Sequence, residues 1–256
     1  MNEKIAVAIE KRVAVITINR ERAMNALDDE ALSALDGALQ RCADDAAIRV
    51  VVLTGAGVRA FSAGSDIKEL ARQTKAELAA HVEFGQQITA KMVDHPCILI
   101  AAIEGYCLGG GLEIALACDI RVAGAGASFG LPEVVRLNAL PSWGGTFRLA
   151  PLVGMGRARE LILLGRTLDA DEALLWGLIN AVTPEGGALV RALDMARALP
   201  DNTQRSALSL AKRLLTHGAQ VNAHAAHYLE YLADQVVSGS SAFASSIKSF
   251  EKKSTE

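Results

Sequence analysis

The spacing of hydrophobic residues predicts alternating strands and helices over the first two thirds of the chain. Leu32, Leu35 and Leu39 recur at helical spacing, whereas residues 48–54 form a β-branched run ending at a glycine, which is typical of a buried strand. The same pattern predicts a hairpin of strands at 5–9 and 13–18, strands at 97–103 and 119–122, a helical region at 67–94 with a break near 73–74, and a short helix after Gly109.

From about residue 151 onward the strand pattern fades and helical spacing dominates. Strands that alternate with helices predict the α/β class, with largely parallel strand pairing. We therefore expect an α/β catalytic core over residues 1–190 and a helical C-terminal region over residues 191–256. The helices expected in this part of the chain lie at residues 155–164, 169–176, 188–198, 203–217 and 222–237.

Composition excludes several classes of protein. The chain has 256 residues, is 51% hydrophobic and carries a formal net charge of -3 with dispersed lysines and arginines, so we expect no nucleic-acid partner. No apolar run approaches the roughly 18 residues of a membrane helix, and the N-terminus lacks the pattern of a secretory signal. Four cysteines without CxxC spacing read as reduced thiols, so we expect a cytoplasmic protein. His224 and His227 share a helical face without a third ligand, so we expect no metal site.

Two glycine-bearing turns are the strongest candidates for chemistry. Residues 61–66 (Phe-Ser-Ala-Gly-Ser-Asp) and 105–113 (Gly-Tyr-Cys-Leu-Gly-Gly-Gly-Leu-Glu) each lie between a predicted strand and a predicted helix. Glycine inside a helix costs about 1 kcal/mol relative to alanine, so three in a row need a reason. Free N–H groups at a helix start can stabilise negative charge on an oxygen. The alternative is a pair of tight turns with close helix packing.

Two glutamates accompany these turns. Glu113 lies in the first helical turn after the triple glycine, and Glu133 follows Pro132, which favours a helix start. Two carboxylates beside a pair of oxyanion donors can move protons next to an activated carbonyl. A single glutamate at a helix start is more often a partner of the helix dipole, and this alternative stays open for each residue alone.

Taken together, five motifs resemble the crotonase superfamily, and specifically the enoyl-CoA hydratases. The resemblance implies a spiral of ββα units with a helical C-terminal trimerisation region, acyl-CoA thioesters as substrates, and a homotrimer or a homohexamer built as a dimer of trimers. CoA would enter as part of the substrate, so no separate cofactor is expected. The motifs are residues 61–66, 105–113, 118–120 (Cys-Asp-Ile), 129–133 (Phe-Gly-Leu-Pro-Glu) and 144–146 (Gly-Gly-Thr).

The resemblance also implies roles for individual residues. The backbone N–H groups of Ser65 and Gly110 would form the oxyanion hole for the thioester oxygen. Glu113 would take a proton from the attacking water, and Glu133 would supply a proton to C2. Hydratases in the family carry both glutamates, and both are present here. The positions implied to lie along the substrate and its CoA moiety are Asn25, Ala26, Arg59, Ala63, Ser65, Asp66, Ile67 and Gly109.

One segment departs from the family pattern. Residues 134–143, which border the acyl pocket in the family, are one residue longer than usual and lack the usual central glycine. Arg136, Leu140 and Trp143 would line the acyl pocket, and Trp143 replaces a small residue. The change could select a polar or carboxylated acyl group with Arg136 as its counter-ion, or it could be an adjustment of a surface loop.

Three other functions remain possible at this point. A Δ3,Δ2-enoyl-CoA isomerase would use Glu133 alone, a lyase or hydrolase of another acyl-CoA could use the same scaffold, and a non-catalytic CoA- or RNA-binding protein would need a concentrated basic face. A nucleophile elbow at Ser62 is disfavoured, since the first glycine is missing and no partner histidine is placed.

Overall fold

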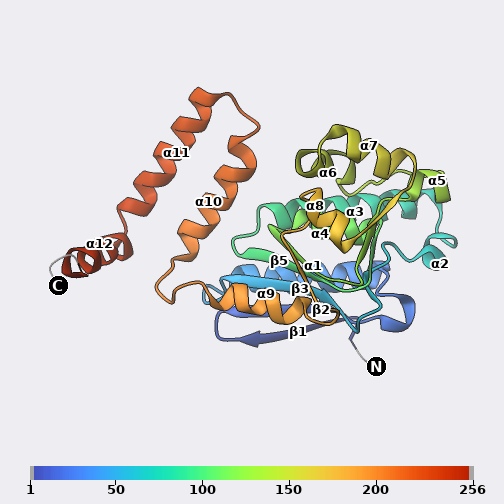
Figure 1. Ribbon diagram of the computed structural model, residues 1–256, viewed down its shortest axis with the longest axis horizontal. Helices are drawn as coiled ribbons and strands as arrows, with labels where there is room; N and C mark the ends of the chain where they lie inside the picture. The colour runs from blue at the N-terminus through green and yellow to red at the C-terminus, as the bar shows by residue number, and fades with distance from the viewer. Residues whose placement is uncertain (1–2, 254–256) are drawn as a thin grey trace.

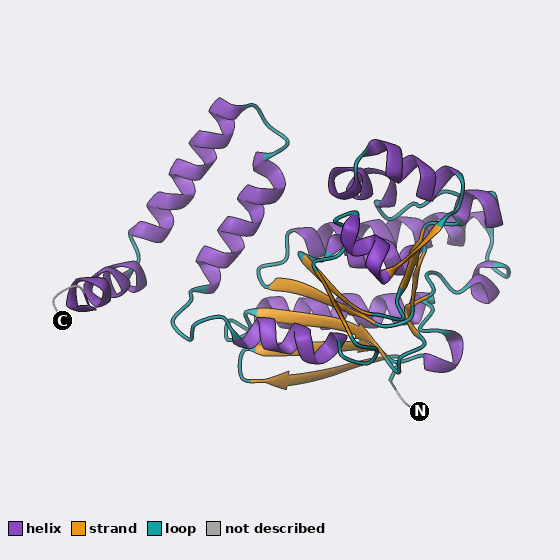
Figure 2. Cartoon of the chain, viewed as in Figure 1, coloured by secondary structure: helices purple, strands orange, loops and turns teal. Residues whose placement is uncertain are grey.

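The computed structural model describes residues 3–253, and it describes side chains up to residue 248. Two β-sheets lie together among helices, and a helical hairpin projects from one end of this body (Figures 1 and 2). The N-terminal strands form the lower edge of the larger sheet in this view, and the C-terminal helices lie at the far left. The mixed α/β class and the helical C-terminal region predicted from the sequence are confirmed.

The larger sheet has six strands in the order β1-β2-β3-β5-β7-β10. The first two form the predicted antiparallel hairpin, and every other neighbouring pair is parallel. The strands are β1 (Ile5–Glu10), β2 (Val13–Ile18), β3 (Val50–Gly55), β5 (Ile98–Ile103), β7 (Ile120–Gly124) and β10 (Ala181–Thr183).

The first four residues of the central strand β3 are all apolar because both faces of the strand are covered. Val50 and Val52 pack in a cluster that includes alanines of α9 (Ala188–Arg197), whereas Val51 and Leu53 belong to the main core on the opposite face. Alternate residues of a strand point to opposite faces, so a strand buried on both sides needs a continuous hydrophobic run. This explains the uninterrupted β-branched run that predicted it.

A smaller sheet of four short strands was missed by the sequence pattern. Its order is β4-β6-β8-β9, and each strand has three residues, too few to display a periodicity of two. Strands β4 and β6 each lead directly into one of the two glycine turns, so their parallel pairing brings those turns side by side. The strands are β4 (Ala60–Ser62), β6 (Tyr106–Leu108), β8 (Ser128–Gly130) and β9 (Thr167–Asp169).

Side-chain caps begin several of the helices around the sheets. Asp28 caps α1 (Asp29–Asp44), and Thr74 forms a capping box with Glu77 at the start of α3, which explains the predicted break near residues 73–74. The other elements here are a 3₁₀ turn (Glu21–Ala23), α2 (Ile67–Leu70), α3 (Lys75–Val93), α4 (Gly110–Ala117), α5 (Glu133–Leu137), α6 (Gly145–Val153), α7 (Met155–Leu163) and α8 (Ala170–Leu175).

The C-terminal region consists of α10 (Arg205–Gly218), α11 (Ala223–Ser238) and α12 (Ser241–Lys253). In Figure 1, α10 and α11 form a hairpin that points away from the sheets. Lys212 ties α10 to the core, because its Nζ lies 2.9 Å from Asp119 Oδ2 and donates to the carbonyl of Met92. Helix α9 spans residue 190 and packs on the larger sheet, and the division of the chain at that residue stays a prediction.

Candidate active site

The two glycine turns meet so closely that side chains would not fit between them. Gly64 has a φ of +92°, and a Cβ built on it would lie 2.9 Å from the amide nitrogen of Gly110. A Cβ on Gly111 would lie 2.4 Å from the carbonyl oxygen of Ser62. Real Cβ atoms do not approach backbone this closely, so glycine is required for the contact between β4 and the start of α4.

Each turn presents one backbone amide that the fold does not use. Leu27 donates to the carbonyl of Gly64 and accepts from the amide of Asp66, so Ser65 lies in an extended segment with its own N–H on the opposite edge. Gly110 is the first residue of α4, where amides lack partners within the helix. Across residues 3–253 neither amide has an acceptor, and the two belong to adjoining turns.

Glu113 projects from α4 into the interior and is fixed there by two backbone amides. Its Oε1 accepts hydrogen bonds from the N–H groups of Trp143 at 2.7 Å and Gly145 at 2.8 Å, and the residue is only 2% exposed. Burial raises the pKa of Glu113 to about 7, and the charge of Glu133 adds to this rise. The hydrogen bonds from the two amides lower the pKa and offset part of the effect. The carboxyl group can therefore change its protonation state near neutral pH.

Glu133 begins α5 and lies against the second glycine turn. A Cβ on Gly109 would lie 3.1 Å from its Oε1, and Gly109 has a φ of +54°. In the described part of the chain the buried Oε2 has no hydrogen-bond partner, and burial raises the pKa of Glu133. A buried polar atom without a partner is rare in proteins and points to a functional group. The two carboxyl groups thus differ, since amides hold one and the other is unpartnered.

Trp143 holds the turn that supplies the two amides to Glu113. Its ring fills hollows left by Gly85 and Gly110, where added Cβ atoms would lie 2.1 Å and 2.5 Å from ring atoms. Its carbonyl accepts hydrogen bonds from Thr89 Oγ1 at 2.8 Å and from the guanidinium of Arg148 at 2.6 Å. The sequence identified Trp143 only as a bulky replacement, because the matching hollow at Gly85 lies 58 residues away.

His81 is a polar residue of the site that sequence reasoning missed. It projects from α3 with its side chain 2% exposed, and its Nε2 lies 3.0 Å from Ser65 Oγ. Its Nδ1 lies 2.6 Å from Asp29 Oδ1, and its ring centroid lies 5.4 Å from that of Trp143. A histidine at a buried helical position is a weak signal by itself, and its partners come from two other elements.

Known proteins resemble this chain in sequence and in fold. Residues 8–255 match the sequence model of a family described as enoyl-CoA hydratase/isomerase. The chain belongs to the enoyl-CoA hydratase/isomerase family. This confirms the resemblance found in the sequence.

Among its relatives in this family, the short-chain-enoyl-CoA hydratase of Clostridium acetobutylicum is 39% identical over 211 residues, 82% of this chain and 80% of that one. The crotonyl-CoA hydratase of Syntrophomonas wolfei is 35% identical and covers 89% of this chain and 87% of its own. A crystal structure of enoyl-CoA hydratase from Bacillus anthracis superposes with a TM-score of 0.93 at 37% identity, covering 98% of this chain and 96% of the other.

Two residues expected along the substrate of this family member have their polar groups occupied by the fold. Asn25 is fully buried. Its side chain accepts a hydrogen bond from the amide of Arg20 and donates one to the carbonyl of Ala60, so it joins the segment around the 3₁₀ turn to β4. Burial alone would raise the pKa of Asp66, but the hydrogen bond and charge of Arg20 outweigh it and the pKa is lowered. Ala26 is buried, whereas Arg59, Ala63 and Ile67 are exposed.

The acyl-pocket residues predicted from the departing segment lie in different environments. Trp143 is buried beside Glu113, whereas Arg136 and Leu140 are exposed, the latter to 69%. Of these three residues, only Trp143 forms a hydrogen bond with one of the two glutamates, through its backbone N–H to Glu113. Roles of Arg136 and Leu140 toward the acyl group stay predictions.

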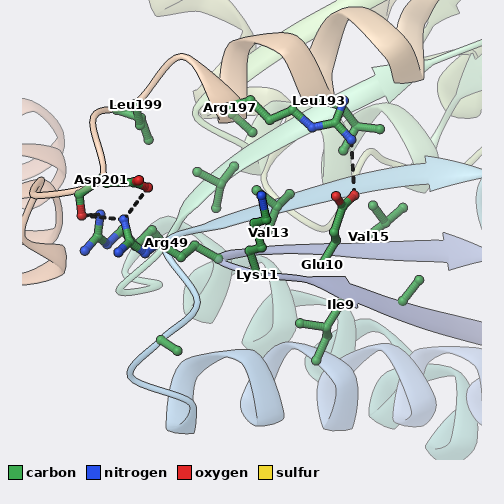
Figure 3. Close-up of a pocket in the computed structure, with 15 residues that line it drawn as sticks. Ile9, Glu10, Lys11, Val13, Val15, Arg49, Leu193, Arg197, Leu199 and Asp201 are labelled. Atoms are coloured by element: carbon green, nitrogen blue, oxygen red, sulfur yellow. Dashed lines mark hydrogen bonds and ion pairs between the residues drawn. The ribbon is translucent and has the colours of Figure 1, made fainter.

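One cavity of this enoyl-CoA hydratase/isomerase family member lies away from the glutamates. It has a volume of about 810 Å³ and lies between strands β1–β3 and the segment after α9 (Figure 3). Two of its arginines already have acidic partners, since Arg12 lies 2.7 Å from Asp201 and Arg197 lies 3.1 Å from Glu10. None of the candidate catalytic residues lines it, so we place the chemistry at the glycine turns.

Within residues 3–253, no cluster of histidine, cysteine, aspartate and glutamate side chains is arranged to hold a metal ion. In the same part of the chain, no helix combines the length and apolarity needed to cross a membrane.

Proposed function

We propose that this protein adds water across the C2=C3 double bond of a short-chain 2-enoyl-CoA to give the 3-hydroxyacyl-CoA. Its family and the names of its relatives in Clostridium and Syntrophomonas support this class of reaction and a short acyl chain. The observation that carries the proposal is the pair of unlike carboxyl groups beside the glycine turns, one buried and held by amides and the other half-buried with an unpartnered oxygen.

The thioester oxygen binds to the unused amides of Ser65 and Gly110. Two N–H groups withdraw electron density from the carbonyl and, through the conjugated double bond, make C3 electrophilic. Removing one such donor typically costs about 3–4 kcal/mol of transition-state stabilisation. Because the donors are backbone groups fixed by adjoining turns, they need no reorganisation as charge develops on the oxygen.

Glu113 acts as the base and Glu133 as the acid. The amides of Trp143 and Gly145 favour the ionised form of Glu113, which takes a proton from the water that attacks C3. Burial favours the protonated form of Glu133, whose unpartnered Oε2 can deliver a proton to C2. An isomerase needs only Glu133, so the fixed position of Glu113 favours hydration.

We also propose that the protein assembles as a homotrimer, or as a homohexamer of two trimers. The supporting observation is α11, whose Tyr228, Leu232 and Val236 follow one another at intervals of four residues and are 43–63% exposed. Such a stripe lies on one face of a helix, and a large exposed apolar face marks an interaction surface.

The direct test follows the loss of ultraviolet absorbance of the conjugated thioester when crotonyl-CoA is added. We expect Glu113→Gln and Glu133→Gln each to lower kcat/KM at least about tenfold, which corresponds to about 1.4 kcal/mol. Glu83→Gln on the exposed surface of α3 is the matched control and should hydrate crotonyl-CoA at the parent rate. Near-parental rates in both catalytic variants would contradict the two-carboxylate mechanism.

A further inference from the structure

Side chains from three separate elements form a hydrogen-bonded chain at the proposed oxyanion hole. His81 of α3 lies between Ser65 of the first glycine turn and Asp29 at the start of α1, at 3.0 Å and 2.6 Å respectively. The hydration mechanism uses none of these three side chains, since it takes only the backbone N–H of Ser65. A buried histidine linked to both a hydroxyl and a carboxylate therefore needs a separate explanation.

The geometry of this chain is that of an activated nucleophile. When the Nδ1 proton of His81 is donated to Asp29, Nε2 is left to accept the hydroxyl proton of Ser65. Asp29 is oriented in turn by Gln73, whose Nε2 donates to its second carboxylate oxygen at 2.9 Å. The His81 ring is fixed by burial and by its contact with Trp143. The base His81 is therefore within hydrogen-bond distance of both the nucleophile Ser65 and the orienting group Asp29.

Ser65 also combines two groups that serine proteases place on one residue. In serine proteases the nucleophilic serine supplies one of the oxyanion-hole amides itself, so its hydroxyl lies beside the carbonyl carbon that the amide polarises. Ser65 has the same two groups, an unused N–H and a hydroxyl on His81. The neighbouring Ser62 lacks this role, because its hydroxyl accepts a hydrogen bond from the amide of Gly64.

We propose that Ser65, His81 and Asp29 form a catalytic triad that hydrolyses acyl-CoA thioesters bound in the oxyanion hole. This second activity rests on the proposed function, because the thioester must bind to the same two amides. It differs in the carbon attacked, which is the thioester carbonyl carbon rather than C3. A saturated acyl-CoA has no double bond to hydrate and can undergo only the second reaction.

The reaction proceeds in two balanced steps. Ser65 Oγ attacks the carbonyl carbon and its proton passes to His81 Nε2; the carbon–sulfur bond then breaks, and the CoA sulfur leaves with that proton as free thiol. Water next attacks the acyl-Ser65 ester and gives a proton to His81, and the ester bond breaks as Oγ recovers the proton. The products are CoA and the carboxylic acid, with water as the only co-reactant.

The experiment compares two rates in the full-length protein. Butyryl-CoA reports hydrolysis, through a thiol reagent that detects free CoA, and crotonyl-CoA reports hydration, through its absorbance. We expect parent protein to release CoA, and His81→Gln to lower the ratio of hydrolysis to hydration by about 10²-fold or more. His217→Gln is the matched control. His217 lies on α10 of the C-terminal hairpin, with its Nε2 2.7 Å from Oδ1 of Asp94 at the end of α3, and its variant should retain both rates.

A second measurement does not depend on acyl-CoA binding. An alkyl fluorophosphonate, which loses fluoride to an activated serine, should label Ser65 of the parent protein, as located by peptide mass spectrometry. Ser65→Ala and His81→Gln should not be labelled at that peptide. If His81 only stabilises the turn, the His81→Gln variant will lose hydration and hydrolysis by the same factor, and the triad is overturned.

Two further outcomes separate this proposal from the proposed function. Hydration of crotonyl-CoA without any release of CoA from butyryl-CoA, and without fluorophosphonate labelling, would overturn the triad while leaving the hydratase intact. Labelling of Ser65 together with hydrolysis, but without hydration, would support the triad and contradict the proposed hydratase.

Discussion

Glu113 and Glu133 have different environments although both lie beside the same turns. Two amides bind one oxygen of Glu113, whereas Glu133 keeps an unpartnered oxygen. Burial raises the pKa of both groups, and the charge of Glu133 further disfavours ionisation of Glu113. Two carboxyl groups in different environments can divide the roles of base and acid between them.

The pH dependence of hydration should reflect this pair. The pKa of Glu113 is raised to about 7, and Glu113 must be ionised to act as the base. We therefore expect kcat/KM for crotonyl-CoA to rise with pH through about 7, as Glu113 ionises. A stopped-flow pH profile checks this expectation, and a rate that is flat across neutral pH would contradict it.

The buried charge of Glu113 should also be visible in stability. Its pKa is higher in the folded protein than in the unfolded chain, so the folded state loses stability as pH rises from about 4.5 to about 7. Glu113→Gln removes the ionisable group. We expect the unfolding free energy of this variant, relative to the parent, to rise by about 2 kcal/mol between pH of about 5 and about 8.

Thermal unfolding at fixed protein concentration measures this difference. Glu83→Gln, on the exposed face of α3, controls for the loss of a negative charge as such. A Glu113→Gln difference that stays constant over the same pH range would mean that burial does not disfavour the charge of Glu113.

At the scale of elements, four strands of three residues each determine where the chemistry lies. Strands β4 and β6 pair in parallel and end at the two glycine turns, so their pairing converts two distant sequence motifs into adjoining amides. Parallel strands end at the same edge of a sheet, and ligands commonly bind there in α/β folds. The helix dipole of α4 adds positive potential at the same edge.

The contact between the turns can be tested at Gly64. Its φ of +92° is unfavourable for alanine, and the added Cβ would lie 2.9 Å from the Gly110 amide nitrogen. We expect Gly64→Ala to lower kcat/KM for hydration by about 10²-fold, the loss typical of one oxyanion donor. Gly156→Ala in α7 is the control, since a Cβ there meets nothing within 4 Å, and it should keep full activity. Equal activity of the two variants would refute the close contact.

At the scale of the whole molecule, the C-terminal helices stand apart from the sheets. Residues of α11 expose apolar side chains that no other described part of the chain covers (Figure 1). Lys212 anchors α10 to the core through Asp119, which fixes the direction in which the hairpin projects. This arrangement suits a surface that is covered by neighbouring copies of the chain.

Assembly should therefore depend on the exposed stripe of α11. We expect the parent protein to sediment as a trimer or hexamer and Val236→Glu to shift it toward smaller species, because a charge would be buried at an apolar interface. Gln235→Glu places the same charge on the residue directly before Val236 and should leave the assembly unchanged. Analytical ultracentrifugation checks both variants, and a monomeric parent would exclude the proposed assembly.

Particular residues show which elements could be predicted from the sequence and which could not. The helical spacing of Leu32, Leu35 and Leu39 predicted α1, and the apolar run over residues 48–54 predicted β3, since both patterns are local. Helix α6 was not predicted because it contains Pro151, and proline usually interrupts a helix. The glycine motifs and the two glutamates were identified, but the chain of His81, Ser65 and Asp29 was not.

The family, the main strands and helices, and the types of residue available for catalysis could all be predicted from the amino-acid sequence, because they depend on neighbours within a few positions or on motifs in a fixed order. The folded chain was needed to show which amides are unused, which carboxylate is bound by amides, which has an unpartnered oxygen, and that His81 links Ser65 to Asp29. Those properties depend on contacts between segments 16 to 58 residues apart and on exclusion of water, and neither is encoded in local periodicity.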